Sequence, residues 1–147
     1  MAITQAIANS FKKLLLEGDQ NFKASGGDKF KIALYTSSAT LNSATTVYPG
    51  DSTGNQVSNS GQYTQGGGKL VNAGTSMTAG VARVDFADRS FTGVTLTARG
   101  ALIYNTSFSN KAVAVLNFGS DKTATSGTFT IQFPAATSTA AILRISD

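Results

Sequence analysis

The amino-acid sequence predicts a mainly β protein, built as a single β-sandwich or jelly-roll-like domain preceded by one N-terminal amphipathic helix. Three observations predict this class. Only residues 2–17 repeat apolar side chains at helical spacing, the chain from residue 29 onward alternates apolar and polar residues, and turn-forming residues separate the alternating runs. With 147 residues, 41% of them hydrophobic, the chain can form one domain core. We therefore expect a helix within residues 1–18 and one β domain over residues 19–147.

The predicted helix carries an apolar stripe whose members recur every three or four residues: Ile3, Ile7, Phe11, Leu14 and Leu15. Gly18 follows as a helix-ending residue, and Lys12 and Lys13 lie toward the end where the helix dipole favours cations. Leu16 interrupts the polar face and widens the stripe. The stripe either packs on the chain's own β domain or docks against another subunit, and two lysines are few for a membrane-surface helix. All five stripe residues are candidate interaction residues.

The strands are predicted from runs in which every second residue is apolar. Phe30, Ile32 and Leu34 form the first such run and predict a half-buried strand. Further runs lie at 81–86, 94–98, 102–104, 112–118, 128–133 and 140–145. The chain holds sixteen Ser and nineteen Thr, and Thr on the solvent face of strands explains much of this excess. Seven to nine short strands favour a sandwich or jelly roll, without fixing the strand order.

Residues 36–80 form the irregular part of the chain, rich in Ser, Thr, Asn and Gly. Two short β-like pieces, 45–48 and 70–73, interrupt it. The polar stretch at about 46–69 is predicted as a long loop, and loops of this length in compact domains are functional, disordered or held by a neighbour. Tyr48, Tyr63 and Leu70 are therefore further candidate interaction residues.

Absent residue types exclude most familiar catalytic chemistry. The chain contains no Cys and no His. It therefore has no thiolate nucleophile, no Ser-His-Asp triad, no Cys-ligated zinc and no ordinary transition-metal site. We expect no catalytic residue, no cofactor and no metal, and we interpret the protein as non-enzymatic.

Three local motifs resemble functional signatures, but each departs from its pattern. Residues 10–13 match S-x-x-K, although the chain is far too short for the enzymes that use it. Residues 66–69 read Gly-Gly-Gly-Lys, but Tyr63 and Leu70 stand where a P-loop needs Gly and Ser or Thr. Acidic residues at 85, 88 and 121 lack the dense spacing of a calcium loop, and Asp88 beside Arg89 favours a turn with a local ion pair.

Charge gives little sign of a nucleic-acid or membrane partner. Twelve Lys and Arg against eight Asp and Glu give a net charge of +4, and the basic residues are scattered. No apolar run is long enough to cross a bilayer, and the N-terminus lacks the features of a signal peptide. We expect a protein that is synthesised in the cytoplasm and binds neither nucleic acid nor membrane.

Several segments resemble a family of small structural proteins of tailed bacteriophages. The similarity covers nearly the whole chain except about 46–69, and its motifs are spread along the sequence. They include Met1-Ala2-Ile3-Thr4-Gln5-Ala6, Phe30-Lys31-Ile32-Ala33-Leu34-Tyr35-Thr36-Ser37, Val84-Asp85-Phe86-Ala87-Asp88, Thr97-Ala98-Arg99-Gly100-Ala101-Leu102-Ile103-Tyr104-Asn105, Phe129-Thr130-Ile131-Gln132-Phe133-Pro134 and Ala141-Ile142-Leu143-Arg144-Ile145. The resemblance implies a location in the virion, after synthesis in the host cytoplasm, and it transfers no catalytic residue.

The resemblance leaves the position within the particle open. Our first expectation is a capsid decoration or cement protein that contacts the major capsid protein and forms a homo-oligomer such as a trimer. The alternative is a neck, baseplate or tail-fibre adaptor that contacts tail or neck proteins. A receptor- or glycan-binding module is less favoured, because sugar sites stack sugars on aromatic rings and the chain has no Trp.

Overall fold

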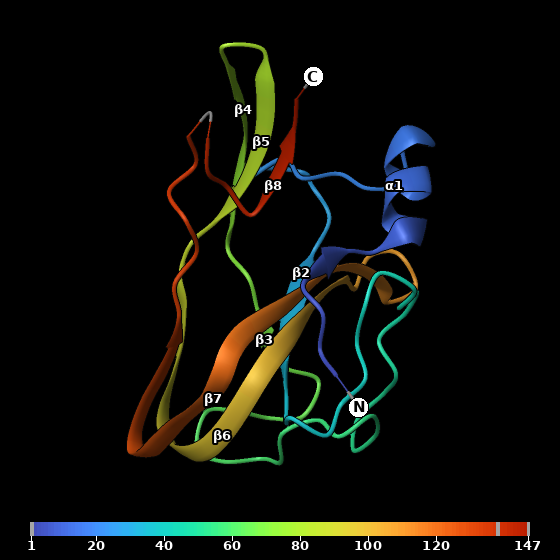
Figure 1. The fold of residues 1–147 in the computed structure, drawn as a ribbon. Coiled ribbons are helices and arrows are strands. Elements are labelled where there is room, and N and C mark those ends of the chain that lie inside the picture. Colours follow the sequence, from blue (N-terminus) through green and yellow to red (C-terminus); the bar gives the residue numbers. More distant parts are fainter. Residues whose placement is uncertain (1, 138, 147) are drawn as a thin grey trace.

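The computed structural model describes residues 2–137 and 139–146, which form two antiparallel sheets and one short helix (Figure 1). The larger sheet has the strand order β1-β7-β6-β2-β3 and the smaller sheet the order β4-β5-β8. Their bounds are β1 Ala6–Ile7, β2 Phe30–Tyr35, β3 Gly68–Lys69, β4 Asn72–Thr78, β5 Val81–Phe86, β6 Arg89–Asn105, β7 Lys111–Ile131 and β8 Leu143–Ile145, and helix α1 is Asn9–Leu16. The predicted fold class, a mainly β domain with an N-terminal helix, is confirmed.

The helix is shorter than the sequence pattern indicates, so the expectation of a helix over residues 1–18 is wrong for residues 2–8. Ala6 and Ile7 form β1 and pair with β7, while Ile3 makes a parallel bridge to Leu41. The Thr4 and Ala8 backbone N–H groups donate to neighbouring segments rather than along a helix. The physical reason is an ambiguity of period: apolar residues four apart satisfy a strand with period two as well as a helix.

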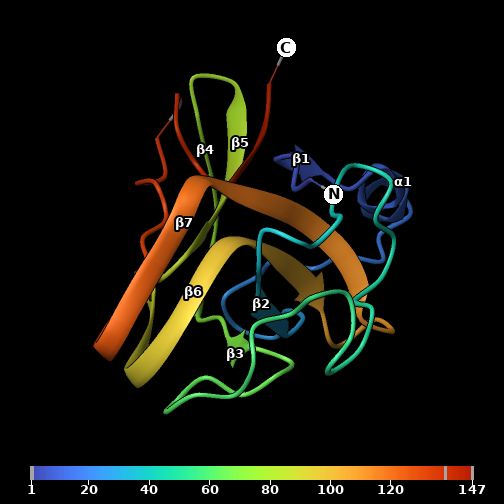
Figure 2. The ribbon, with the colours of Figure 1, turned by 60° about the horizontal axis from the view of Figure 1, so that its bottom comes forward.

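A long β6–β7 hairpin replaces four strands that the sequence predicts separately. β6 has 17 residues and β7 has 21, and Figures 1 and 2 show the curved ribbon they make across the molecule. The pairing register shifts at several places, including between Phe91 and Val94, where Gly93 adopts a φ of 64°. The glycines that suggested turns therefore mark β-bulges, which bend a ribbon without ending it.

The core is centred on β2 and on the half of β6 that pairs with it. Ile32, Ala33, Leu34 and Tyr35 are all fully buried, so the strand predicted as half-buried is covered on both faces. The cover comes in part from the irregular segment between β2 and β3, whose buried apolar side chains are Ala39, Leu41, Val57 and Tyr63.

The smaller sheet is joined to the larger one by a cluster of phenylalanines. Phe22 stacks on Phe30 with ring centroids 4.6 Å apart, Phe86 contacts Phe30 edge-on at 5.6 Å, and Phe133 lies 5.9 Å from Phe86. Beyond this cluster the β4–β5 hairpin projects from the body (Figure 1). The smaller sheet therefore has packed side chains at its base and much less cover toward its tip.

The expected local ion pair between Asp88 and Arg89 is not formed. The Asp88 carboxylate accepts a hydrogen bond from the Phe133 backbone N–H, and the Arg89 guanidinium lies over the Phe91 ring, 4.6 Å from its centroid. Neighbouring residues of an extended chain point to opposite sides, which separates the two side chains.

Candidate functional site

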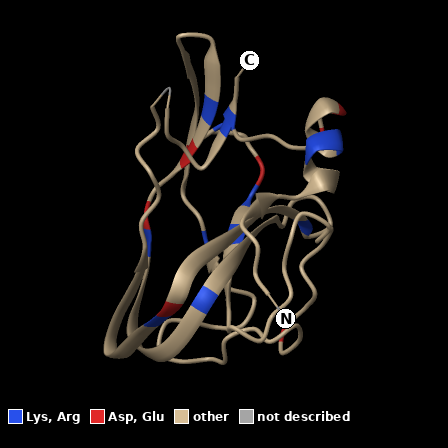
Figure 3. Ribbon diagram, viewed as in Figure 1, with Lys and Arg blue, Asp and Glu red and all other residues tan. Residues whose placement is uncertain are grey.

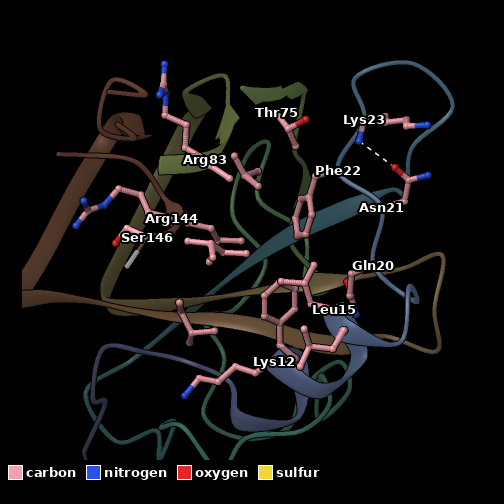
Figure 4. Close-up of a pocket in the computed structure, with 17 residues that line it drawn as sticks. Lys12, Leu15, Gln20, Asn21, Phe22, Lys23, Thr75, Arg83, Arg144 and Ser146 are labelled. Carbon is pink, nitrogen blue, oxygen red and sulfur yellow. Dashed lines mark hydrogen bonds between the residues drawn. The ribbon is translucent and has the colours of Figure 1, made fainter. Parts of the chain in front are cut away.

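An open apolar groove lies between α1 and the smaller sheet and encloses about 680 Å³ (Figure 4). We call it the α1–β8 groove and define it by its main apolar residues: Phe11, Leu15, Phe22, Val84, Leu143 and Ile145. Phe11, Phe22 and Leu143 are themselves buried. The volume is in the range of cavities that bind ligands or inserted side chains.

The strand register explains why one face of the smaller sheet is apolar. Ala82 lies opposite Ile145 and Val84 opposite Leu143, so these four side chains share the face toward α1. On α1, Phe11 and Leu15 are four residues apart and lie on one side of the helix. The groove therefore has an apolar wall from the sheet and another from the helix.

Two large apolar side chains at the groove remain in solvent. Leu16 is 90% exposed and Ile145 is 62% exposed. Sequence reasoning marked Leu16 only as an interruption of the polar helix face and did not select Ile145. The available signals were this interruption and the alternation of the last strand, in which Ile145 continues the face of Leu143.

Gln20 is a polar residue at the α1 side of the groove, beside Leu15 (Figure 4). It is only 7% exposed, and its Oε1 accepts a hydrogen bond of 2.8 Å from Asn105 Nδ2. The same Nδ2 donates to Asp28, while Asn105 Oδ1 accepts from the Ser107 N–H, which fixes the orientation of both amides. Gln20 Nε2 is then a buried donor that has no partner among residues 2–137 and 139–146.

Basic residues surround the groove. Among the residues that the structure describes, its lining includes Lys12, Lys23, Arg83 and Arg144 and no Asp or Glu. Figure 3 shows basic positions on α1, β5 and β8. In Figure 4 the two arginine side chains extend away from Leu15, so they lie on the other face of the smaller sheet.

The structure brings together only some of the predicted interaction residues. Ile7, Phe11 and Leu15 line the groove. Leu14 is half-buried and lies outside the lining, and Ile3 is buried in the core, where it contributes to the chain's own packing.

The predicted interaction residues in and beside the 46–69 loop lie elsewhere. Tyr63 is fully buried and Leu70 nearly so, which excludes both as surface contacts of this fold and corrects their selection. Tyr48 is half-buried and stacks on Tyr104 with ring centroids 4.4 Å apart. Aromatic residues in a polar loop bury their rings wherever the loop can fold back on a sheet, and the sequence alone does not show that it does so.

The hydroxyls of Tyr48, Tyr63 and Tyr104 belong to one polar network. The Tyr63 hydroxyl accepts a hydrogen bond from the Leu34 N–H at 2.8 Å and donates to Gln56 Oε1 at 3.0 Å. Gln56 Oε1 also accepts from the Gly66 N–H, and Gln56 Nε2 donates to the Tyr48 hydroxyl. We call this set the tyrosine network, completed by Asp51 and Tyr104.

Burial keeps these hydroxyls protonated. Desolvation raises the pKa of Tyr63 and of Tyr35 above the ordinary value, and it raises the pKa of Tyr104 to about 12. Desolvation also raises the pKa of Tyr48, and the hydrogen bond to Asp51 adds to the effect. All four tyrosines are therefore neutral near pH 7. The hydroxyls of Tyr48, Tyr63 and Tyr104 are hydrogen-bonded in the network, whereas the buried Tyr35 hydroxyl has no partner among the described residues.

The motifs considered for catalysis have other partners in the fold. Lys13 Nζ lies 3.5 Å from Glu17 Oε1 on the protein surface, and Lys13 makes no hydrogen bond with Ser10. Gly68 and Lys69 form β3, and the Gly67 N–H closes a turn on Thr64. Within the described ranges no three Asp or Glu side chains gather as metal ligands, and no helix is long and apolar enough to span a bilayer.

Comparison with protein-family models, with curated proteins and with solved structures finds no match to this chain. The groove must therefore be interpreted from its own residues.

Proposed function

We propose that this protein is a non-enzymatic structural component of a tailed-bacteriophage virion that acts through protein–protein contacts, first of all as a capsid decoration or cement protein on the major capsid protein. The observation that carries the proposal is the α1–β8 groove. It places an apolar surface, with Leu16 and Ile145 in solvent, where a partner can cover it. The resemblance of the strand and terminal motifs to phage structural proteins supports the particle as the location.

The groove supports binding rather than catalysis because of what lines it. Contiguous exposed apolar surface bordered by polar residues is typical of binding sites. Acid–base catalysis needs a positioned titratable group of suitable pKa, and the titratable side chains among the described lining residues are lysines and arginines. Burial of apolar side chains at a partner surface is therefore the chemistry that these residues favour.

Quantitative mass spectrometry of purified particles of the phage that encodes the chain tests this function. We expect the chain in the particle, with on the order of hundreds of copies for a capsid lattice protein and roughly six or twelve for a neck or tail adaptor. The larger number supports decoration of the capsid, and the smaller number supports the adaptor position. Absence from the particle overturns the proposal.

A further inference from the structure

We propose that two copies of this chain associate through their β4 strands, which pair antiparallel about a two-fold axis at Ser76 and join the two smaller sheets into one. The inference goes beyond the proposed function, because it concerns the contact between two copies and not their location. Three features support it: the free edge of β4, its lack of charge, and a register that pairs with itself.

The first feature is the free edge of β4. In the order β4-β5-β8 this strand has a neighbour on one side only. The hairpin closes with a two-residue turn at 79–80, where both residues have a positive φ, so Thr78 and Val81 form a hydrogen-bonded pair. Bonded and non-bonded pairs alternate along an antiparallel ladder, which points the N–H and C=O groups of Thr75 and Met77 away from β5. Within the described residues these groups bond to no other segment.

This free edge is confined to the outer half of β4. At the base of the hairpin, Asn72 Nδ2 donates to the Lys23 carbonyl, and the register shifts between Asn72 and Gly74, where Gly74 adopts a φ of 95°. A bulge of this kind blunts an edge strand. The residues from Thr75 to the turn are exposed, Met77 to 74%. A pairing strand is therefore centred near the middle of this exposed half, which projects from the body (Figure 1).

The second feature is the absence of charge along this edge. No charged residue and no proline lies between Lys69 and Arg83, whereas the edge strands β3 and β8 contain Lys69 and Arg144. Natural sheets use edge lysines and prolines to prevent edge-to-edge pairing, and β4 has neither. Two copies of Arg83 would be three strand spacings apart, about 14 Å, which exceeds a Debye length of about 8 Å. Charge therefore neither selects a foreign strand nor separates two copies.

The third feature is that the edge complements itself. When two β4 strands run antiparallel with their Ser76 residues opposite each other, Thr75 of each copy faces Met77 of the other. Each of these two pairs exchanges two main-chain hydrogen bonds, so all the outward groups of Thr75 and Met77 are satisfied. The exposed Met77 side chain then packs on Thr75 of the second copy, on the same face of the joined sheet. A second copy thus supplies the whole pattern that the edge needs.

A single cysteine on the two-fold axis tests this geometry, because the chain has no Cys of its own. In Ser76→Cys the two cysteines form a non-hydrogen-bonded pair with Cα atoms about 4.5 Å apart, within disulfide range. In the control Thr78→Cys, exposed and on the same face, they are about 13 Å apart along the strands. Mild oxidation of the full-length protein and non-reducing electrophoresis should show disulfide-linked dimer forming at least tenfold faster for Ser76→Cys. Equal rates, or no dimer, would overturn the proposal.

Lysine substitutions distinguish β4 from the other edge of the same sheet. Met77→Lys should raise the dissociation constant of the dimer at least tenfold, measured by sedimentation equilibrium, because it places two like charges in the contact. Ile145→Lys is the control, since Ile145 is 62% exposed and lies in the same row, across Ala82, but on β8. Weakening by Ile145→Lys alone would place the contact at β8 and refute the inference.

Hydrogen exchange of single amides, followed by NMR, identifies the paired strand. Exchange at Thr75 and Met77 should slow as the protein concentration rises, whereas Ser76 and Thr78 bond to β5 at every concentration and should change little. A chain that stays monomeric, a trimer, or slowing confined to other strands would each contradict the inference. The particle experiment remains separate: a monomeric chain present in virions keeps the proposed function and loses this inference, and a dimer absent from virions does the opposite.

Discussion

The 46–69 loop and the α1–β8 groove differ in burial, and the difference is opposite to what their compositions suggest. The loop is polar in sequence, yet its Gln56, Val57 and Tyr63 are buried against the larger sheet. The groove is formed by apolar side chains, yet Leu16 and Ile145 remain in solvent. Composition therefore does not decide which segment is available to a partner. What decides it is whether the groups of a segment find their partners within the same chain.

A small number of hydrogen bonds hold the loop, and several of them share one side chain. Gln56 alone joins Tyr48, Tyr63 and the Gly66 backbone, and Tyr63 carries the connection to the Leu34 backbone of β2. Such a network is stable only when nearly all of its members are satisfied, because an unpaired buried group costs more than one bond contributes. The loop is consequently specified by side chains rather than by regular secondary structure.

The largest expected effect comes from removing the centre of this network. Tyr63→Ala deletes a fully buried ring that packs edge-on to Phe91 and leaves the Leu34 N–H without its acceptor. We expect a loss of about 3 to 5 kcal/mol in the free energy of unfolding, measured by urea denaturation. Thr64→Ala is the control and should have little effect, because Thr64 follows Tyr63 directly in the loop but its side chain is exposed. A loss below about 1 kcal/mol for Tyr63→Ala would show that the loop does not contribute to the core.

Sequence reasoning is most successful where one pattern has one structural meaning. The alternation of Phe30, Ile32 and Leu34 predicts β2 correctly, because a period of two with large apolar residues is specific for a strand. The helix predicted from the apolar stripe is wrong at Ile3 and Ile7, because a spacing of four residues suits both a helix and a strand. Long-range hydrogen bonds to Leu41 and β7 decide between them, and such partners are not visible in a local pattern.

The candidate site is predicted less completely than the fold. Phe11 and Leu15 belong to the helical stripe and do line the groove, but the opposite wall comes from β5 and β8, which are distant along the chain. No sequence feature distinguishes Gln20. Its Nε2 has no hydrogen-bond partner among the described residues because Asn105 Nδ2 donates to its Oε1, and the sequence does not show this orientation. A surface assembled from distant segments needs the strand register, which alternation alone does not fix.

The second expected effect, a loss of stability at high pH, belongs to the loop and not to the groove. The pKa of Tyr104 is raised to about 12 and those of Tyr35, Tyr48 and Tyr63 are raised as well, whereas tyrosines in the unfolded chain titrate near a pKa of about 10. Above about pH 10 the unfolded chain therefore binds fewer protons than the folded one, and the stability of the fold decreases with rising pH. The stabilisation is fully present below about pH 10 and is lost as the pH passes through the folded-state values.

Urea denaturation between about pH 8 and pH 12, with tyrosinate absorbance recorded on the same samples, measures this effect. We expect the urea midpoint to fall above about pH 10 and tyrosinate to appear together with unfolding. Tyr104→Phe should show a shallower fall, since it removes one of the four groups. A midpoint that stays constant over the whole range, with tyrosinate forming in the folded protein, would show that the network is open to solvent.

The smallest expected effect concerns the groove. Leu16→Glu and Ile145→Glu should each change the free energy of unfolding by no more than about 0.5 kcal/mol, because both side chains are already in solvent and surface substitutions have effects of this size. Val71→Glu, at another exposed apolar position, serves as the matched reference, and urea denaturation is again the measurement. A loss above about 1 kcal/mol at Leu16 or Ile145 alone would mean that the chain closes its own groove in solution, and an occupied groove cannot receive a partner. A negligible loss would instead separate the two regions by role: the contacts of the loop stabilise the fold, and the apolar surface of the groove stays available to another molecule.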